Sequence, residues 1–548
     1  MRIIVIGAVA AGTSAAAKAR RNDENAQIVV YEKDRHISYS GCGMPYYISG
    51  EVEEAEELYP RDAGYFKKKY NVDIRPRHEV MAIHPKDKTL RVKNLNTGEE
   101  FTDHYDRLVI ATGAYAVTPP IAGKDQPHVF TLRTVGDMLQ IHDFIEAHKP
   151  KTAAIIGSGF IGLEMCESLR GLGLEVTLIE KLPQVIPALD PDMAVHVQKH
   201  LEEKGVKVFT GATATQITEK EVLLDEGSRM PADLVLVSTG VKPNVALAKE
   251  AGIALGETGA IHVDDAMRTS QPDIYACGDC IETPHILTGK PVWLPLGSTA
   301  NKTGRIAGDA VTGGDLRFRG VMGTGIFRVF DLGVAQTGLS EREARGVGFD
   351  VAVSHASKLS RPGYMGGKEL TIKAVADKVT GKLLGAQIVG YEGVDKRIDV
   401  FVTALTYGAM AEDLSHLDLA YAPPFSTTRD PVMYAGMILD GVISRGRPLM
   451  TAEELEERRK QGEKIQVIDA REKKSFEKRC VEGAVCIPQE ELRQQCENLD
   501  KEAITLTYCN RGTTGNAAQN ILIGKGFKRV YNLSGGEKQY HAVKRLKQ

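Results

Sequence analysis

The stretch TAAIIGSGFIG, residues 152–162, decides the fold of most of this chain. Its apolar half predicts a strand, and its second half is a glycine turn of the form G-x-G-x-x-G that leads into a helix. Such glycines let the backbone approach a pyrophosphate at the helix N-terminus. A second predicted strand, residues 176–179, ends at Glu180, whose carboxylate would accept a hydrogen bond from a ribose 2′-hydroxyl and repel a 2′-phosphate. The unit therefore predicts a dinucleotide site that favours NADH over NADPH, a preference that the neighbouring Lys181 weakens.

A similar unit lies at the N-terminus of the chain. Its predicted parts, in order, are strand 2–6, glycine turn 7–12, helix 13–21 and strand 28–31. Glu32 follows the second strand, in the position that Glu180 takes in the other unit. Val9 replaces the middle glycine, so this motif alone is also compatible with an ordinary strand-turn-helix. Together the two units predict an α/β chain with two dinucleotide sites.

The length and composition of the chain limit its class. Its 548 residues, 42% of them hydrophobic, suffice for three or four domains. With 69 basic against 72 acidic residues and a net charge of -3, it has no overall field that would attract nucleic acid or an anionic membrane. No apolar run reaches the roughly 18 residues of a membrane span, and the opening strand shows no cleavable signal, so we expect a cytoplasmic protein. The eight cysteines are too scattered for a disulfide framework.

Three further stretches complete a known pattern. YDRLVIATGA (105–114) and ADLVLVSTGVKPN (232–244) each place a strand and a Thr-Gly turn after one unit, and DIYACGDC (273–280) places Asp279 after a strand. Residues 1–445 thereby resemble the two-dinucleotide flavoprotein disulfide reductases. The resemblance implies FAD in the first unit, NAD(P)H in the second, and Asp279 on the ribityl chain of FAD. It also implies that the NAD domain is inserted in the FAD domain and that a third domain makes a homodimer.

The stretch SYSGCGMPYY, residues 38–47, carries the expected redox centre, Cys42. The resemblance places Cys42 beside the flavin. Common members of the family have a second cysteine five positions on, where this chain has Tyr47, so an internal disulfide is excluded. A lone thiolate that reduced flavin regenerates can form a mixed disulfide, a persulfide or a sulfenic acid. The alternative is a buried structural cysteine.

The branch of the family is indicated by three positions. Peroxide- and oxygen-reducing relatives have a histidine in the first glycine turn, where this chain has Ala10. Because alanine cannot transfer a proton, the sequence fits the peroxide- and oxygen-reducing branches less well. The coenzyme A disulfide reductase branch brings two tyrosines from the other subunit, and Tyr364 in RPGYMGG and Tyr421 in LAYAPPF match them. A phenol can donate a proton to a leaving thiolate. The alternative for both is a tyrosine in a domain core, and for Tyr364 the two interpretations are balanced.

The resemblance also assigns binding positions. Residues expected to bind FAD or NAD(P)H are Gly7, Ala11, Gly12, Glu32, Lys33, Val80, Thr112, Gly113, Gly157, Gly159, Ile161, Gly162, Glu180, Gly240 and Asp279. Residues expected to bind coenzyme A are Ser14, Lys18, Arg21, Ser38, Asn301, Lys302 and Arg429. Gly41 stands where the branch has an asparagine, so one amide contact is lost. Solvated surface charge is the alternative for each lysine or arginine taken alone.

A separate module follows the stretch RGRPLMTAEELEERRKQGEK, residues 445–464. Thr451 is the expected N-cap of its first helix, with Glu454 three residues on. Further on, a strand over 506–508 ends at Cys509, and the residues up to Gly515 can surround its sulfur with backbone N–H groups before a helix begins at Asn516. The module resembles a single-domain rhodanese, with Asp469 and Arg471 as its structural signature and Cys509 as sulfur carrier. Its departures, Cys480 for a histidine and Thr514 and Gly515 in the loop, leave thiosulfate turnover open.

The other cysteines receive simpler interpretations. Cys277 and Cys280 form C-x-x-C around the flavin aspartate without a second pair for zinc, and we expect no metal site. Cys166, Cys486 and Cys496 are expected to serve packing.

The expected architecture is α/β with two Rossmann-like domains, an α+β dimerisation domain and a C-terminal α/β rhodanese domain. The expected bounds are 1–117 with 246–317 for FAD, 118–245 for NAD(P)H, 318–445 for dimerisation and 450–548 for rhodanese. The expected function is NAD(P)H-dependent reduction of CoA disulfide, CoA persulfide or polysulfide, with FAD, NADH and coenzyme A bound and the NADH to NADPH ratio open. The alternatives are an NADH oxidase or peroxidase-like flavoenzyme, and a redox-sensing binding protein.

Overall fold

The computed structural model describes residues 1–545, which form two compact units. The first unit comprises residues 1–181 and 212–321, and the second comprises residues 182–211 and the chain from residue 322 onward. No helix within residues 1–545 is both long and apolar enough to cross a bilayer.

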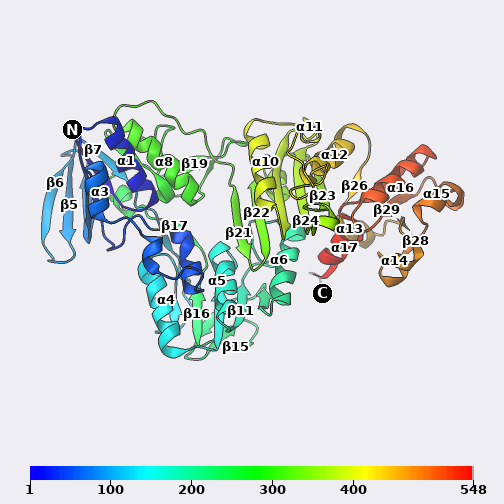
Figure 1. The fold of residues 1–548 in the computed structure, drawn as a ribbon, viewed down its shortest axis with the longest axis horizontal. Coiled ribbons are helices and arrows are strands. Elements are labelled where there is room, and N and C mark those ends of the chain that lie inside the picture. Colours follow the sequence, from blue (N-terminus) through cyan, green and yellow to red (C-terminus); the bar gives the residue numbers. More distant parts are fainter. Residues whose placement is uncertain (546–548) are drawn as a thin grey trace. The chain divides into compact units, whose positions relative to one another are not determined.

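The first unit contains the N-terminal glycine turn on a parallel sheet. Its strand order is β18-β7-β1-β2-β3, with β18 Ile274–Ala276, β7 Arg107–Ile110, β1 Arg2–Ile6, β2 Gln27–Glu32 and β3 Asp73–Pro76. Two helices, α1 Ala10–Asn22 and α8 Gly297–Ala310, lie side by side on this sheet (Figure 1). The predicted helix over 13–21 is confirmed. It begins three residues earlier, at Ala10, with Val9 as its N-cap.

The second glycine turn lies on another parallel sheet of the same unit. Its central strands are β10 Thr152–Ile156, β11 Glu175–Glu180 and β16 Leu234–Val237, with β9 Val129–Phe130 beside β16. Helix α5 Phe160–Gly171 follows the turn. The chain therefore leaves the first sheet after β7, builds this sheet, and returns to the first at β18.

The second unit contains an antiparallel sheet and a parallel sheet. The antiparallel sheet has the order β21-β22-β25-β24-β23, with β21 Gly325–Val329, β22 Leu332–Gly338, β25 Leu383–Gly390, β24 Glu369–Asp377 and β23 Val351–Leu359. It carries α10 Val394–Thr406 and α12 Pro431–Ser444. Helix α6 Pro191–Glu203 also belongs to this unit.

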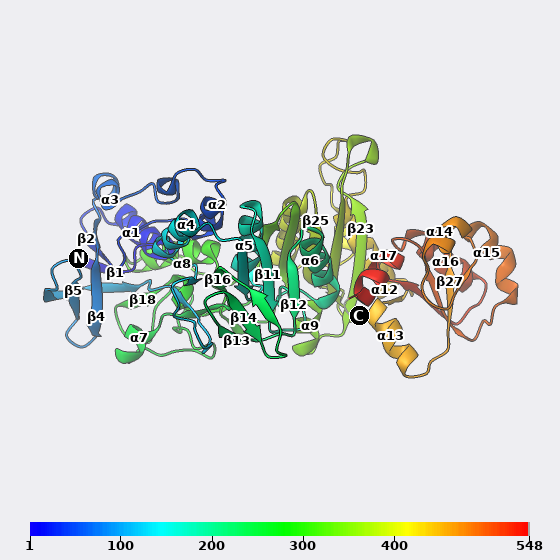
Figure 2. The ribbon, with the colours of Figure 1, turned by 90° about the horizontal axis from the view of Figure 1, so that it is seen from below.

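The parallel sheet of the second unit forms the centre of the C-terminal module (Figure 2). Its order is β26-β30-β29-β27-β28, with β26 Leu449–Met450, β30 Arg529–Leu533, β29 Ile504–Tyr508, β27 Ile465–Asp469 and β28 Ala484–Cys486. Its helices are α13 Ala452–Lys460, α14 Lys473–Lys478, α15 Gln489–Gln495, α16 Thr513–Gly524 and α17 Gly536–Arg545. The predicted capping box is confirmed, since Thr451 Oγ1 accepts from Glu454 N at 3.1 Å and Thr451 N donates to Glu454 Oε2 at 2.9 Å.

The predicted start of the helix after Cys509 is wrong by three residues. Helix α16 begins at Thr513 and not at Asn516. Gly512 is its N-cap and has a φ of 95°, a left-handed conformation that glycine adopts without strain. The chain therefore enters the helix sooner, and the loop around Cys509 is shorter than predicted.

Candidate active site

The N-terminal glycine turn is shaped by close backbone contacts. Gly7 has a φ of 105°, and a side chain there would collide with the carbonyl of Ala111. A side chain at Gly12 would collide with the carbonyl of Gly7. Glu32 Oε2 accepts from Ala8 N at 2.8 Å, and burial raises the pKa of the Glu32 carboxyl. The predicted acid thus lies at the N-terminus of α1, where a dinucleotide would bind.

The second turn repeats this geometry. Gly157 has a φ of 104° and abuts the carbonyl of Ser238, and Gly162 abuts the carbonyl of Gly157. Glu180 Oε2 accepts from Ser158 N at 2.9 Å and from Ser158 Oγ at 2.6 Å. A Cβ at Gly159 would meet no atom within 4 Å, so the turn leaves open space at the helix N-terminus. Both turns fit a dinucleotide phosphate.

Asp279 lies at the carboxyl end of β18, as predicted, and is held by an arginine. Asp279 Oδ2 accepts from Arg133 Nη2 at 2.9 Å, and Arg133 Nε donates to Ala114 O at 3.2 Å. Trp293 Nε1 donates to the Asp279 carbonyl at 2.8 Å. No motif in the sequence marks Arg133, which we missed because it lies 146 positions from Asp279.

Cys42 lies in a short 3-10 turn, Gly41–Gly43, just before helix α2 Met44–Ile48. Its side chain is exposed, and its thiol is free. Surrounding chain atoms and the charge of Glu164 raise the pKa of the Cys42 thiol, and the charge of Arg133 opposes them. The alternative of a buried structural cysteine therefore does not fit this chain. Arg133, whose charge acts on the pKa of this thiol, also pairs with Asp279, the predicted flavin-binding carboxylate.

The remaining predicted cofactor residues all lie in the first unit. Thr112 Oγ1 donates to Asn244 O at 2.7 Å, and Gly113 and Gly240 have φ angles of 67° and 104°. Val80 is buried on β4 His78–His84, and Lys33 is exposed directly after Glu32. Ala11 and Ile161 belong to the first turns of α1 and α5.

Five predicted coenzyme A residues gather on the α1–α8 helix pair. Gly304 and Gly308 of α8 touch the backbone of Ala11 and Ala15, so the two helices cross closely. The pair carries Ser14, Lys18, Arg21, Asn301 and Lys302. Lys18 Nζ is paired with Asp309 Oδ1 at 3.0 Å, so its charge is partly compensated within the chain. Ser38, with a φ of 50°, lies in the same unit, and Arg429 is exposed in the second unit.

Tyr364 and Tyr421 lie on two connections of the second unit, Tyr364 in the 3-10 turn Gly363–Met365 between β23 and β24 and Tyr421 in the loop before α12. Their side chains are 78% and 49% exposed, which does not fit the alternative of core tyrosines in this chain. Arg397 is 1% exposed and ties the two loops together. Its Nη2 donates to Ser360 O at 2.8 Å and to Asp430 Oδ2 at 2.9 Å, and its Nε donates to Asp430 Oδ1 at 3.1 Å.

Cys509 lies at the carboxyl end of β29 and is 6% exposed. The turn after it is held from both sides. Glu537 N donates to the Cys509 carbonyl at 2.9 Å, and Arg471 Nη1 donates to Asn510 Oδ1 at 2.9 Å. Arg471 also binds Asp469 through two nitrogens, Nε at 2.9 Å and Nη2 at 2.6 Å. The Asp469–Arg471 signature therefore fixes the loop that presents Cys509.

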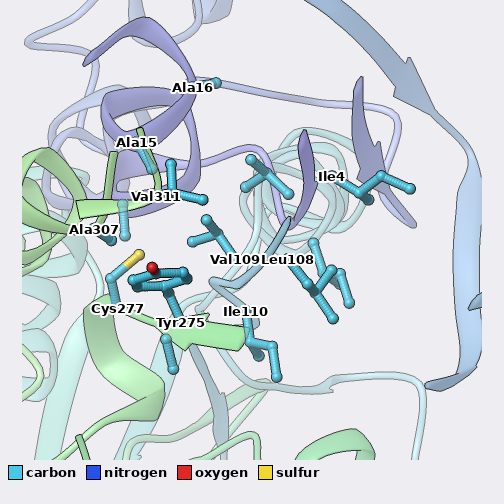
Figure 3. Close-up of a cluster of buried hydrophobic side chains, with 14 of the residues drawn as sticks. Ile4, Ala15, Ala16, Leu108, Val109, Ile110, Tyr275, Cys277, Ala307 and Val311 are labelled. Carbon is cyan, nitrogen blue, oxygen red and sulfur yellow. The ribbon is translucent and has the colours of Figure 1, made fainter. Parts of the chain in front are cut away.

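Four of the other six cysteines occupy packed positions, whereas Cys480 and Cys486 are half-buried, which does not fit the predicted packing role of Cys486; none of the eight is in a disulfide. Cys166, Cys277, Cys280 and Cys496 are 0% exposed. Figure 3 shows Cys277 among apolar side chains, with Tyr275 and Ala307 beside it. Burial raises the pKa of Cys277 and Cys280, which disfavours their thiolates.

Three family models match successive parts of the chain. The model described as pyridine nucleotide-disulphide oxidoreductase matches residues 1–303, its dimerisation domain matches residues 326–431, and the rhodanese-like domain matches residues 451–542. The predicted fold class, an α/β chain with a dimerisation domain and a C-terminal rhodanese domain, is thereby confirmed.

Individual relatives agree with this assignment. The NADH oxidase of Methanocaldococcus jannaschii is 38% identical over 440 residues, 79% of this chain and 98% of the relative. The CoA-dependent NAD(P)H sulfur oxidoreductase of Pyrococcus furiosus is 37% identical over 442 residues, 80% and 99% of the two chains. The solved structure of a NAD-dependent persulfide reductase from A. fulgidus is similar over 99% of this chain and 100% of its own, with a TM-score of 0.92 and 38% identity. This chain belongs to the pyridine nucleotide-disulphide oxidoreductase family and carries a C-terminal rhodanese-like domain.

Proposed function

We propose that this chain is an FAD-dependent NAD(P)H reductase of CoA disulfide, CoA persulfide or polysulfide, with Cys42 as its redox centre and Cys509 as its sulfur carrier. The observation that carries the proposal is the exposed, free thiol of Cys42 in the unit that contains both dinucleotide turns and Asp279, whose carboxylate Arg133 holds at 2.9 Å. The names of three relatives support the substrate class: a CoA-dependent NAD(P)H sulfur oxidoreductase, a coenzyme A disulfide reductase and a NAD-dependent persulfide reductase.

The chain's own residues fit both cofactors. The first glycine turn, Glu32 and Asp279 would hold FAD, and the second turn with Glu180 would hold NAD(P)H. When bound, FAD supplies the path by which the hydride electron pair of NAD(P)H reaches a disulfide.

Cys42 supplies the nucleophile. Its thiolate attacks one sulfur of CoA disulfide, a mixed disulfide forms on Cys42, and the other coenzyme A leaves as a thiolate. Tyr364 and Tyr421 of the partner subunit would donate the proton that the leaving thiolate takes. The exposure of both tyrosines in the single chain, together with a dimerisation domain over residues 326–431, supports a homodimer in which they are covered. We place the enzyme in the cytoplasm, because a lone redox thiol needs a reducing compartment.

An oxidase is the second candidate, because the M. jannaschii relative is named an NADH oxidase. Ala10 stands where a proton-donating side chain would serve peroxide or oxygen chemistry, which favours the reductase. A redox-sensing protein would show no sustained NADH consumption with CoA disulfide or with oxygen as acceptor.

The test is the Cys42→Ser variant of the full chain loaded with FAD. We expect it to lose reduction of CoA disulfide and CoA persulfide while NADH still bleaches the flavin, since hydride transfer needs no thiol. Oxygen uptake by the wild type, measured in parallel, separates the reductase from the oxidase. Normal reduction of CoA disulfide by the variant would contradict the proposal.

A further inference from the structure

The Cys509 loop lies against the antiparallel sheet within the second unit. Lys358, near the end of β23, donates from Nζ to Thr513 Oγ1 at 3.1 Å, and Thr513 is the first residue of α16. His355, three residues earlier on β23, also contacts the rhodanese-like domain, since its N and Nδ1 lie 3.2 Å and 2.8 Å from Ser534 Oγ. The dimerisation domain therefore contributes side chains to the surroundings of Cys509.

The cations that belong to the Cys509 site are already engaged by carboxylates. Arg511 forms an ion pair with Glu369, and Lys538 Nζ lies 2.9 Å from Glu369 Oε2. Arg471 is bound to Asp469. The sequence also has no further cation in the loop, because Thr514 and Gly515 occupy its last positions.

Lys358 is placed differently from these three cations. Within residues 1–545 it has no carboxylate at ion-pair distance, and its other neighbour is the ring of Tyr434, 3.8 Å from Nζ to the centroid. Burial and the charge of Arg511 lower the pKa of Lys358, and the Cys509 thiolate acts in the opposite direction. A partly desolvated ammonium group without an acidic partner thus lies within electrostatic reach of the Cys509 sulfur.

We propose that Lys358 of the dimerisation domain is a positioning residue for the sulfur carried on Cys509. Its charge stabilises the Cys509 thiolate and, after sulfur transfer, the persulfide anion. In the transfer, the Cys509 thiolate attacks the outer sulfur of a persulfide RSSH, a new S–S bond forms, the old one breaks, and RS⁻ leaves with the bonding pair. The role rests on the proposed function of Cys509 as sulfur carrier, and Lys358 supplies from another domain a cation that is not engaged by a carboxylate of the described residues.

The test measures the reactivity of Cys509 in the full FAD-loaded chain. Iodoacetamide alkylation of the Cys509 peptide is followed by mass spectrometry between pH 5.5 and 9.5 for the wild type, Lys358→Met, Lys358→Arg and the control Lys378→Met. Lys378 is an exposed lysine after β24 that pairs with Asp350. Other charged or titratable groups around the loop are unchanged in all variants: Glu369, Tyr434, Asp469, Arg471, Tyr508, Arg511, Glu537 and Lys538.

For Lys358→Met we expect alkylation of Cys509 at pH 7 to slow by about three- to tenfold and its pH profile to move to higher pH. Lys358→Arg, which keeps the charge, should stay within about twofold of the wild type, and Lys378→Met should overlay it. Incubation with inorganic polysulfide should leave less persulfide on Cys509 in Lys358→Met. The proposal is overturned if the Lys358→Met profile overlays that of the wild type, or if Lys358→Arg is as slow as Lys358→Met. Alkylation needs no turnover, so failure of the reductase proposal would appear separately, in the Cys42→Ser assay.

Discussion

Asp430→Leu should loosen both tyrosine loops, because Asp430 is the carboxylate partner of the buried Arg397. Asp430 is 2% exposed and Arg397 is 1% exposed, and they share two hydrogen bonds of 2.9 Å and 3.1 Å. Asp430 also accepts from Ser426 Oγ at 2.7 Å and caps α12 by accepting from Val432 N at 3.0 Å. The substitution therefore leaves a buried guanidinium group without its charge partner and a helix without its cap.

The magnitude follows from this burial. Removing one partner of a buried ion pair costs about 3 to 5 kcal/mol, and losing the N-cap costs about 1 kcal/mol more. The double variant Arg397→Met with Asp430→Leu should recover most of the first loss, because an apolar pair replaces an unpaired charge. The matched control is Arg445→Met. Arg445 pairs with Asp440 at 2.7 Å but is 73% exposed, so its loss should cost less than about 1 kcal/mol.

The assay is urea unfolding of the four FAD-loaded proteins at one protomer concentration, combined with kcat/KM for CoA disulfide. We expect the lowest midpoint for Asp430→Leu and a fall in kcat/KM of about tenfold or more, since the loops of Tyr364 and Tyr421 lose their anchor. If Asp430→Leu lowers the midpoint no more than Arg445→Met does, or if the double variant is less stable than Asp430→Leu, the reasoning is refuted.

Three further predictions concern cofactor choice, sulfur relay and pH. Glu180→Ala should narrow the preference for NADH because the repulsion of a 2′-phosphate is lost, and unchanged KM values for both cofactors would remove Glu180 from the site. Cys509→Ser should slow polysulfide reduction more than CoA disulfide reduction. The intact chain should reduce polysulfide faster than an equimolar mixture of residues 1–445 and 446–548, because tethering raises the effective concentration. Equal polysulfide reduction by the intact chain and the mixture would mean that the C-terminal module does not take part. Burial acts to raise the pKa of the Asp192 carboxyl, but the charges of Lys373 and His355 hold this pKa well below its usual range. The ionised carboxylate therefore stabilises the fold above about pH 4, and this stabilisation is lost as the pH falls below that value. The urea midpoints of Asp192→Asn and the wild type should therefore converge as the pH is lowered from 5 to 3, and a constant difference would argue against this ion pair.

The sequence alone predicted the features that depend on neighbouring residues. Gly157 and Gly162 follow from spacing, because a turn that leaves no room for a Cβ admits only glycine. Glu180 could be placed at the end of its strand because the apolar run before it predicts where that strand ends. Cys42 was proposed as the redox centre from the resemblance of its stretch to the flavoprotein reductases, and the capping box at Thr451 was predicted from a spacing of three.

Only the tertiary structure decided how distant side chains meet. Arg133 donates to Asp279 across 146 positions of sequence, and Lys358 donates to Thr513 of the Cys509 loop across 155 positions. Lys18 pairs with Asp309, which lies 291 positions further on (309 − 18). No periodicity or spacing encodes such pairs, because they arise where helices and sheets pack and not along one element. The positions of the two thiols along the chain were therefore predicted from local sequence, whereas the charged side chains around them are brought in by the fold.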